Sequence, residues 1–240
     1  MLIGNSRWHW AAPAPGGQPG LRVQHSPPPP DQGEDQGPDQ GPEGLSALLG
    51  WAAVGPLPSA IPLPSQARLG LADVPLACLP AWLGLDRALA GWGGWRLAAG
   101  PVLVADAGTV LSLTRVDAEG RFAGGRLLAG VALQLRAMAD ATALLPAIAT
   151  HDSMHEQPLG GQVQSLPLWP HDTATAMRSG VVRGLAAAVN AVLAEAKQQE
   201  PRCRLLLTGG DGAALAALLA AEHRPDLCLE ALAALRPLPD

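Results

Sequence analysis

The sequence predicts an α/β protein, and three stretches of the chain carry this prediction. The first, Val102–Val104, is a short apolar run typical of a buried strand, and it leads into Asp106-Ala-Gly-Thr109. The second, Arg204–Thr208, is another apolar strand, which a glycine-rich loop joins to an expected helix over 213–221. The third is the longest expected helix, 174–198, whose apolar residues recur at helical spacing. Strands and helices that follow one another in this way favour sheets covered by helices.

Composition and charge exclude several classes of protein. The 240 residues suffice for one large domain or two small ones. The formal net charge is −5 and the basic residues are scattered singly, with Lys197 the only lysine, so no nucleic-acid-binding surface is expected. The Gly-Lys-Ser/Thr motif of P-loop NTPases is absent. No uninterrupted apolar run of about 18 residues occurs, and the few residues before Arg7 do not make a signal peptide, so no membrane span or secretion is expected.

Neither the cysteines nor the histidines form a clear metal motif. Cys78, Cys203 and Cys228 lack the spacing of a metal site and lie in apolar stretches, so we expect free thiols in a reducing cytoplasm. The run HDSMHE, residues 151–156, resembles a loose metal cluster, but it has no evident third ligand. A solvated loop is the favoured interpretation of that run.

The N-terminal part of the chain combines a short strand pair with a low-complexity insert. Ile3, Trp8 and Trp10 predict two strands around a Gly4-Asn5-Ser6 turn, with His9 at a surface position. Such a turn can donate amides and a hydroxyl to a phosphate, or it can be only a turn. Residues from about 13 to 44 are rich in Pro, Gly, Gln and acidic side chains, which predicts an inserted solvated loop, with a short strand over residues 21–25 left open inside it.

The stretch 102–131 holds the first candidate anion site. Gly108 lacks the Cβ that would keep a phosphate away, and Thr109 adds a hydroxyl donor to a turn of consecutive amides. Asp106 could hold a cation beside that phosphate. A hairpin with ordinary turn residues remains open as the alternative. A second strand is expected over 110–116, and Gly124-Gly125 is expected to open a helical stretch that runs to about Ala139.

Three expected helix starts carry further candidates. Asp86 opens a helix that is predicted to end at Gly93-Gly94. Asp86 is either a helix cap or a base that, together with Arg87 as an anion clamp, stands at the mouth of a pocket. Thr173 opens the longest helix, where its hydroxyl and nearby amides suit an anionic group or serve simply as a cap. Gly209-Gly210-Asp211-Gly212 joins a strand to a helix, a geometry common in nucleotide sites and also in ordinary α/β turns.

Taken in order, these motifs resemble those of the type III pantothenate kinases, a family of the actin-like ATPase superfamily. The resemblance covers the first ten residues and most of the chain from Leu79 onward, and it is absent across the low-complexity insert. It implies two α/β domains of the actin-like ATPase (ribonuclease H-like) type, residues 1–99 and 100–240, with ATP in the cleft between them. The motifs that carry it are GNS at 4–6, GLDR at 84–87, DAGT at 106–109, FAGG at 122–125, Thr-x-x-Ala-Met-x-Ser-Gly from Thr173 and TGGDG at 208–212.

The resemblance also implies a reaction, its cofactors and its residues. The family phosphorylates pantothenate with ATP to 4′-phosphopantothenate, the first step toward coenzyme A, typically as a cytoplasmic homodimer that needs K⁺ or NH₄⁺ and uses Mg²⁺ with ATP. Asp86 matches the family's proton acceptor. The pantothenate contacts match Gly84, Leu85, Asp86, Arg87 and Thr173, the ATP contacts match Gly4, Asn5, Ser6, Thr109, Gly209 and Gly210, and the monovalent-cation ligand matches Asp106.

The sequence departs from the family pattern at a few positions. Leu2 stands where the family usually has an aspartate, which bears on how magnesium and phosphate are held at the first loop. Ser6 replaces a threonine, Ala129 replaces a common proline, and the tyrosine ahead of the GxDR motif is missing because the chain has no tyrosine. Two alternatives therefore stay open: a non-catalytic accessory or regulatory protein with the same fold, and a kinase for another small molecule.

Overall fold

The chain folds into two compact units in the computed structural model. The structure describes residues 1–4, 8–14, 20–26, 48–54, 57, 63–148 and 166–236. The first unit comprises Met1–Gly93 and Asp226–Asp240, and the second comprises Gly94–Pro225. The division falls within a helix, and the C-terminal residues belong with the first unit, whereas the sequence placed the division near residue 100 and the C-terminus in the second domain.

The first unit contains a four-stranded sheet in the order β3-β2-β1-β4. β1 pairs antiparallel with β2 and parallel with β4, while β3 pairs antiparallel with β2. An isolated parallel bridge joins Trp51 to Arg68 beyond β4. A hydrophobic core cluster of this unit contains Met1, Ile3, Trp8, Trp51 and Ala67. The strands are β1 (Leu2–Ile3), β2 (Trp8–Pro13), β3 (Leu21–Ser26) and β4 (Ala52–Ala53).

Short helices complete this unit. Two 3₁₀ helices, η3 (Ser65–Ala67) and η4 (Leu71–Asp73), follow the strands. The helix α5 (Leu227–Leu235) buries its leucines at 227, 229 and 232. The helix α1 (Leu85–Ala98) begins in the first unit and ends in the second.

The second unit is built on a five-stranded sheet in the order β7-β6-β5-β8-β9. β5, β6 and β7 are successive antiparallel neighbours, whereas β8 and β9 run parallel to β5. The first unit repeats this order and these directions through its fourth strand. The strands are β5 (Val102–Ala107), β6 (Val110–Val116), β7 (Phe122–Ala129), β8 (Arg204–Thr208) and β9 (Glu222–His223).

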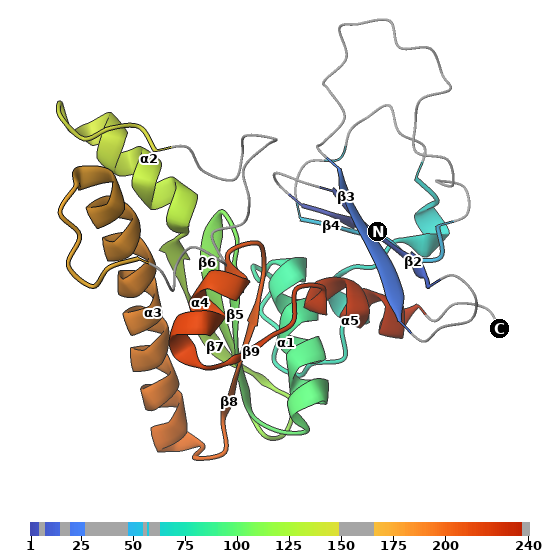
Figure 1. Ribbon diagram of the computed structural model, residues 1–240. Helices are drawn as coiled ribbons and strands as arrows, with labels where there is room; N and C mark the ends of the chain where they lie inside the picture. The colour runs from blue at the N-terminus through green and yellow to red at the C-terminus, as the bar shows by residue number, and fades with distance from the viewer. Residues whose placement is uncertain are drawn as a thin grey trace, which may run out of the picture. The chain divides into compact units, whose positions relative to one another are not determined.

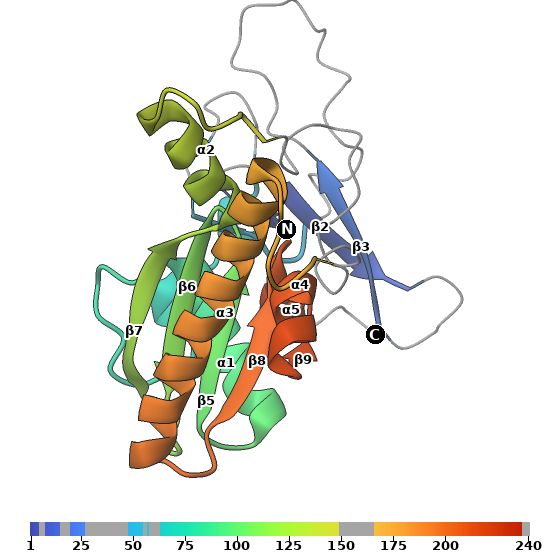
Figure 2. The same ribbon diagram turned by 60° about the vertical axis from the view of Figure 1, so that its left-hand side comes forward.

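Three helices cover one face of this sheet, and the last residues of α1 lie against the other face. The long helix α3 (Thr173–Gln199) crosses the face that carries Leu103, Ala105 and Ala107, beside α2 (Val131–Ala141) and α4 (Gly212–Leu219) (Figures 1 and 2). The opposite face carries Val104, which the end of α1 meets at Gly94. Among the described helices α3 alone is long and apolar enough to cross a membrane by length and composition, and its apolar residues Val181, Leu185 and Val189 lie in the core of this unit.

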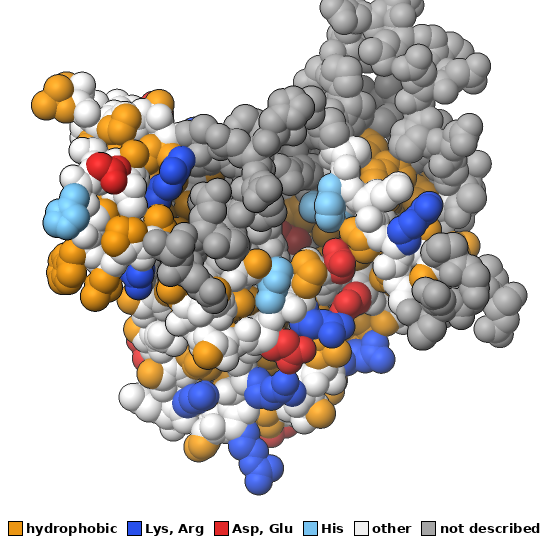
Figure 3. All heavy atoms as spheres, in the orientation of Figure 1, with side chains coloured by type: hydrophobic (Ala, Val, Ile, Leu, Met, Phe, Trp, Pro, Cys, Tyr) orange, Lys and Arg blue, Asp and Glu red, His pale blue; other side chains and the backbone are white. Residues whose placement is uncertain are grey.

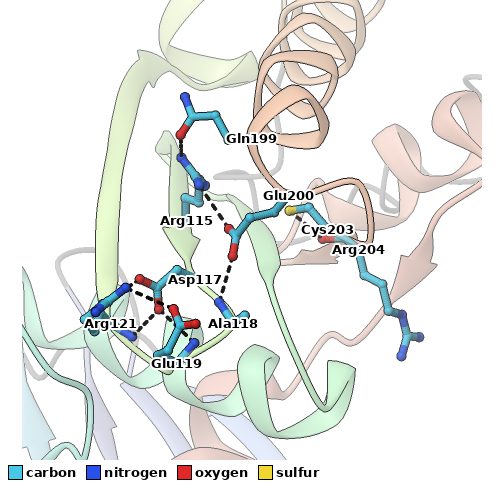
Figure 4. A network of polar contacts seen from close by, with 9 residues as sticks. All are labelled: Arg115, Asp117, Ala118, Glu119, Arg121, Gln199, Glu200, Cys203 and Arg204. Atoms are coloured by element: carbon cyan, nitrogen blue, oxygen red, sulfur yellow. Dashed lines mark hydrogen bonds and ion pairs between the residues drawn. The ribbon is translucent and has the colours of Figure 1, made fainter.

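A polar network ties the β6–β7 hairpin to the end of α3 (Figure 4). Arg115 on β6 donates to Gln199 Oε1 (2.6 Å) and to Glu200 Oε2 (3.0 Å). The other Glu200 oxygen accepts from the Ala118 amide at 2.8 Å. The turn after β6 is closed by Asp117, which accepts from the Arg121 amide at 2.8 Å and from Arg121 Nε at 2.7 Å. On the face shown in Figure 3, basic and acidic side chains are interspersed.

The strands 102–104 and 204–208 and the helix 174–198 are confirmed, but other local predictions are wrong. Gly124 and Gly125 lie within β7, and the helix α2 starts only at Val131, because pairing with β6 overrides the weak strand propensity of glycine.

The helix α1 also does not end at Gly93-Gly94 but continues to Ala98. These glycines serve packing. A Cβ on Gly94 would stand 2.5 Å from Val104 Cγ2, and a Cβ on Gly93 would stand 3.1 Å from the Ala231 side chain. The absent side chains let the helix approach its neighbours closely, which outweighs the low helix propensity of glycine.

Candidate functional site

The second unit gathers its candidate residues at the end of β5. Asp106 is paired in parallel register with Thr208 on β8, so the turns that follow these two strands lie side by side. Gly209, the first residue after β8, has φ +85°, and a Cβ there would stand 2.5 Å from Asp106 Oδ1 and 2.6 Å from the Ala107 carbonyl oxygen. Only glycine fits at this position, because both the backbone conformation and the space exclude a side chain. The loop therefore presses directly against the carboxylate.

The turn Gly108-Thr109 is held from the other side by Gly130. The Gly130 amide donates to the Thr109 carbonyl oxygen at 2.9 Å, and a Cβ on Gly130 would collide with the carbonyl oxygens of Gly108 and Thr109. Gly130 is the N-cap of α2 and precedes it in an extended conformation. Thr109 itself is exposed, so its hydroxyl is accessible to a ligand. Sequence reasoning missed Gly130; a glycine directly before an apolar helix was the signal that could have found it.

The loop after β8 leads into the N-terminus of α4. The Asp211 amide donates to the Ala107 carbonyl oxygen at 2.9 Å, and the Gly212 amide donates to the Gly209 carbonyl oxygen at 3.1 Å. Thr208 is buried and donates its hydroxyl to the Pro225 carbonyl oxygen at 3.2 Å, which anchors the strand end. Gly210 is exposed, and a Cβ there would meet nothing within 4 Å. A glycine loop that opens a helix suits a phosphate or a nucleotide.

In the first unit Asp86 and Arg87 begin α1. Asp86 Oδ1 accepts from the Arg87 amide at 2.8 Å, and a Cβ on Gly84 would stand 2.6 Å from the same oxygen. Burial raises the pKa of the Asp86 carboxyl, against the opposing effects of the Arg87 amide and the Arg87 charge. Burial likewise lowers the pKa of the Arg87 guanidinium, whose residue is only 9% exposed. A half-buried carboxylate with a raised pKa is suited to accept a proton.

Two neighbours of this pair were missed from the sequence. The ring of Trp82, 70% exposed, lies 6.0 Å from the Arg87 guanidinium carbon, within range of a cation–π contact. The Cys228 thiol lies 3.6 Å from the Asp86 carbonyl oxygen. A tryptophan two residues before Gly84 is visible in the sequence, whereas the position of Cys228 depends on how α5 packs.

The remaining predicted residues are placed as follows. Thr173 is the first residue of α3 and is exposed; the capping bond there is made by Asp172, whose Oδ1 accepts from the Thr175 amide at 2.8 Å, so capping does not require the Thr173 hydroxyl. This bond lowers the pKa of Asp172. Gly4 directly follows β1, and Leu2, where the family has an aspartate, is buried in that strand. Asn5, Ser6 and the run 151–156 lie outside the described residues.

The fold defines the general class of protein. The order β7-β6-β5-β8-β9, with the first three strands antiparallel and the last two parallel to β5, is that of the actin-like ATPases, as predicted. The solved structure of a conserved putative Baf family transcriptional activator from Campylobacter jejuni matches with a TM-score of 0.55, covering 98% of this chain and 94% of that one at 17% identity. This likeness supports the fold alone.

Comparison of the sequence with known proteins narrows the class to one family. Residues 72–195 match the family model of type III pantothenate kinase. A type III pantothenate kinase from Synechococcus elongatus is 37% identical over 238 residues, which span 96% of this chain and 90% of the relative. Another from Synechocystis is 34% identical over 95% of this chain and 82% of its own length. The chain belongs to the type III pantothenate kinase family.

Proposed function

We propose that this protein transfers the γ-phosphoryl group of ATP to pantothenate and forms 4′-phosphopantothenate, the first step of coenzyme A biosynthesis. The observation that carries this proposal is the half-buried Asp86 carboxyl at the start of α1, within a Gly84-Leu-Asp-Arg87 motif in a chain that belongs to this family. Phosphoryl transfer needs positioning and charge stabilisation more than covalent chemistry, and glycine turns, hydroxyls and one carboxylate suit it.

The proposed roles at the pantothenate site follow from chemistry and burial. Asp86 accepts the proton of the attacking hydroxyl, since burial raises its pKa toward the range of a general base. Arg87 holds a polar group of pantothenate with a guanidinium that keeps its charge. Gly84 and Leu85 directly precede this pair and are proposed to contact pantothenate, as is Thr173 through its exposed hydroxyl at the start of α3.

ATP and its cations are assigned to the turns that follow the strands. Gly4, Asn5 and Ser6 are proposed to contact phosphate, Thr109 to donate its hydroxyl, and Gly209 and Gly210 to pass close to the nucleotide. Asp106 is proposed to bind K⁺ or NH₄⁺, because a carboxylate is a hard oxygen ligand that suits such cations. Mg²⁺ neutralises phosphate charge when bound with ATP, but Leu2 offers it no carboxylate.

We propose further that the protein is cytoplasmic and forms a homodimer. Support for self-association comes from α3, where Gly180 and Gly184 are spaced one turn apart. A Cβ added at either glycine would meet nothing within 4 Å, so this strip of the helix is uncovered within the described chain. Such a strip lets a second copy approach closely.

The test is an assay of ATP-dependent phosphorylation of pantothenate by the purified protein. The formation of ADP and of the phosphorylated product is measured. Pantothenate-dependent turnover that is lost in Asp86→Asn is expected. A folded protein that binds ATP but shows no turnover would favour the non-catalytic alternative. Turnover of another alcohol, in preference to pantothenate in a substrate panel, would favour a different small-molecule kinase.

A further inference from the structure

Two histidines face each other across β2 and β3. His9 and His25 are direct partners in the antiparallel register, and their Nδ1 atoms lie 2.8 Å apart. The ring centroids are 4.9 Å apart and the ring planes are inclined by 78°. His25 is exposed and His9 is partly exposed, so water and ions reach the pair from the outer strand. Neither residue belongs to the site proposed for pantothenate and ATP.

The strand pair holds these two side chains in place. The pairs on either side, Trp8 with Ser26 and Trp10 with Gln24, continue the same register. The Trp10 indole donates to Ser26 Oγ at 3.1 Å, and Trp8 is buried in the core of the first unit. Because side chains alternate along a strand, His9 lies on the face opposite these tryptophans. The two imidazoles are thus anchored by a fixed backbone and need little reorganisation to act together.

The distance between the two Nδ1 atoms is closer to that of a right-angled coordination geometry than to that of a tetrahedral one. Imidazole nitrogens bind a first-row metal at about 2.0–2.1 Å. Two such nitrogens are about 2.9 Å apart when they subtend a right angle at the metal, and about 3.35 Å apart at the tetrahedral angle. The observed 2.8 Å is a hydrogen-bond distance in the metal-free chain, and it is close to the spacing of adjacent corners of a square or an octahedron. Square-planar or tetragonal nitrogen and oxygen sites are typical of Cu²⁺ and Ni²⁺, and Cu²⁺ is the tightest of the divalent series.

We propose that His9 and His25 form a surface site for a divalent transition metal, with Cu²⁺ bound most tightly, two imidazole nitrogens as ligands and water at the other positions. Without metal, one ring donates its Nδ1 proton to the other ring. With metal, both rings carry their proton on Nε2, so two neutral rings bind the ion without net proton release. Because the ion links adjacent strands, it stabilises the edge of the first unit's sheet.

The site is chemically distinct from the cation site proposed at Asp106. Asp106 offers carboxylate and carbonyl oxygens, which suit K⁺, NH₄⁺ and other hard cations. His9 and His25 offer two imidazole nitrogens, which select borderline transition metals. Metal binding at the histidines can therefore be measured without ATP, pantothenate or turnover, and its outcome does not depend on the proposed kinase function.

The test titrates Cu²⁺ into the full chain carrying Cys78→Ser, which removes the exposed thiol as a competing ligand. Electron paramagnetic resonance counts the coordinated nitrogens, and calorimetry gives stoichiometry and affinity. His25→Gln is the main variant, since His25 lies on the outer strand β3 and is exposed; His9→Gln is the second. His171→Gln, another exposed histidine, is the matched control.

We expect one Cu²⁺ per chain with two imidazole nitrogens, and a higher melting temperature with the ion. Loss of either histidine should weaken binding about a hundredfold, because the second ligand acts at a high effective concentration, while His171→Gln should bind like the parent. Unchanged affinity in His25→Gln and His9→Gln, or a spectrum without two-nitrogen coupling, would overturn the proposal. Circular dichroism of each variant separates a lost ligand from a lost fold.

Discussion

The α-carbon of Gly209 lies against the carboxylate of Asp106, about a hundred residues earlier in the chain: a Cβ on Gly209 would stand 2.5 Å from Asp106 Oδ1. The contact exists because β5 and β8 are parallel neighbours with Asp106 opposite Thr208. It joins the proposed cation ligand to the proposed nucleotide loop within one unit. Both parts can therefore be probed by changing one side of this contact.

Replacing Gly209 with alanine should destabilise the second unit. A left-handed conformation costs a non-glycine residue about 1–2 kcal/mol, and the collision with the Ala107 carbonyl, a backbone group, adds to this. Urea denaturation should show the loss, and the KM for ATP should rise. Gly210→Ala is the matched control: with open space around it, its free energy of unfolding should change by less than about 0.5 kcal/mol. Equal destabilisation of the two variants would contradict the packing argument.

Asp106→Asn should remove the dependence of turnover on potassium. The neutral amide attracts a monovalent cation far less than the carboxylate does, so rates with K⁺ and with Na⁺ should become equally low. The measurement is the ratio of kcat in the two salts at constant ionic strength. Asp140→Asn, an exposed aspartate on α2, should keep the wild-type ratio. Potassium stimulation that persists in Asp106→Asn would place the cation elsewhere.

Asp86→Asn should strongly lower activity and yet stabilise the protein at neutral pH. The pKa of Asp86 is raised by burial, so the folded state binds this proton more tightly than the unfolded state does. The stability linked to this group is therefore greatest below the unfolded pKa and is lost as pH rises through the folded pKa. Loss of a general base lowers kcat by about 10²–10⁴-fold.

The pH dependence provides the check on Asp86. Unfolding measured at pH 7 and again at about pH 4, near the usual pKa of an aspartate, should show that the advantage of Asp86→Asn shrinks in acid. The acidic limb of the wild-type kcat/KM profile should lie above the ordinary pKa of an aspartate. A variant that is less stable than wild type at pH 7 would show that the charged carboxylate is favoured in the folded state.

Two acidic residues near the end of α3 should differ sharply in their effect on stability. Glu200 binds Arg115 and the Ala118 amide with both oxygens, and both side chains of the ion pair are under 20% exposed (Figure 4). Glu200→Ala leaves these donors without their acceptor and should cost about 2 kcal/mol. Glu195 pairs with Arg126 where both side chains are 53% exposed, so Glu195→Ala should cost about 0.5 kcal/mol. Similar melting temperatures of the two variants would contradict this ranking.

Hydrophobic periodicity and turn residues predicted correctly those helices and strands whose local sequence preference agrees with their packing in the fold. The helix 174–198 and the strand 204–208 carry unambiguous apolar patterns, and both are present. The predictions failed where packing reversed the local preference of glycine. Gly124-Gly125 is part of a strand because β6 offers a partner, and Gly93-Gly94 lies within a helix because Val104 and Ala231 need the space.

The sequence by itself determined the α/β class, the family and the residue types at each turn, because these depend on neighbours a few positions apart and on motifs in a set order. Only the tertiary structure decided which of these residues meet. Strand pairing brings His25 to His9 and Gly209 to Asp106, and packing at the start of α1 buries Asp86 and raises its pKa. Distance, burial and pKa are set by contacts between distant segments, and no local pattern encodes them.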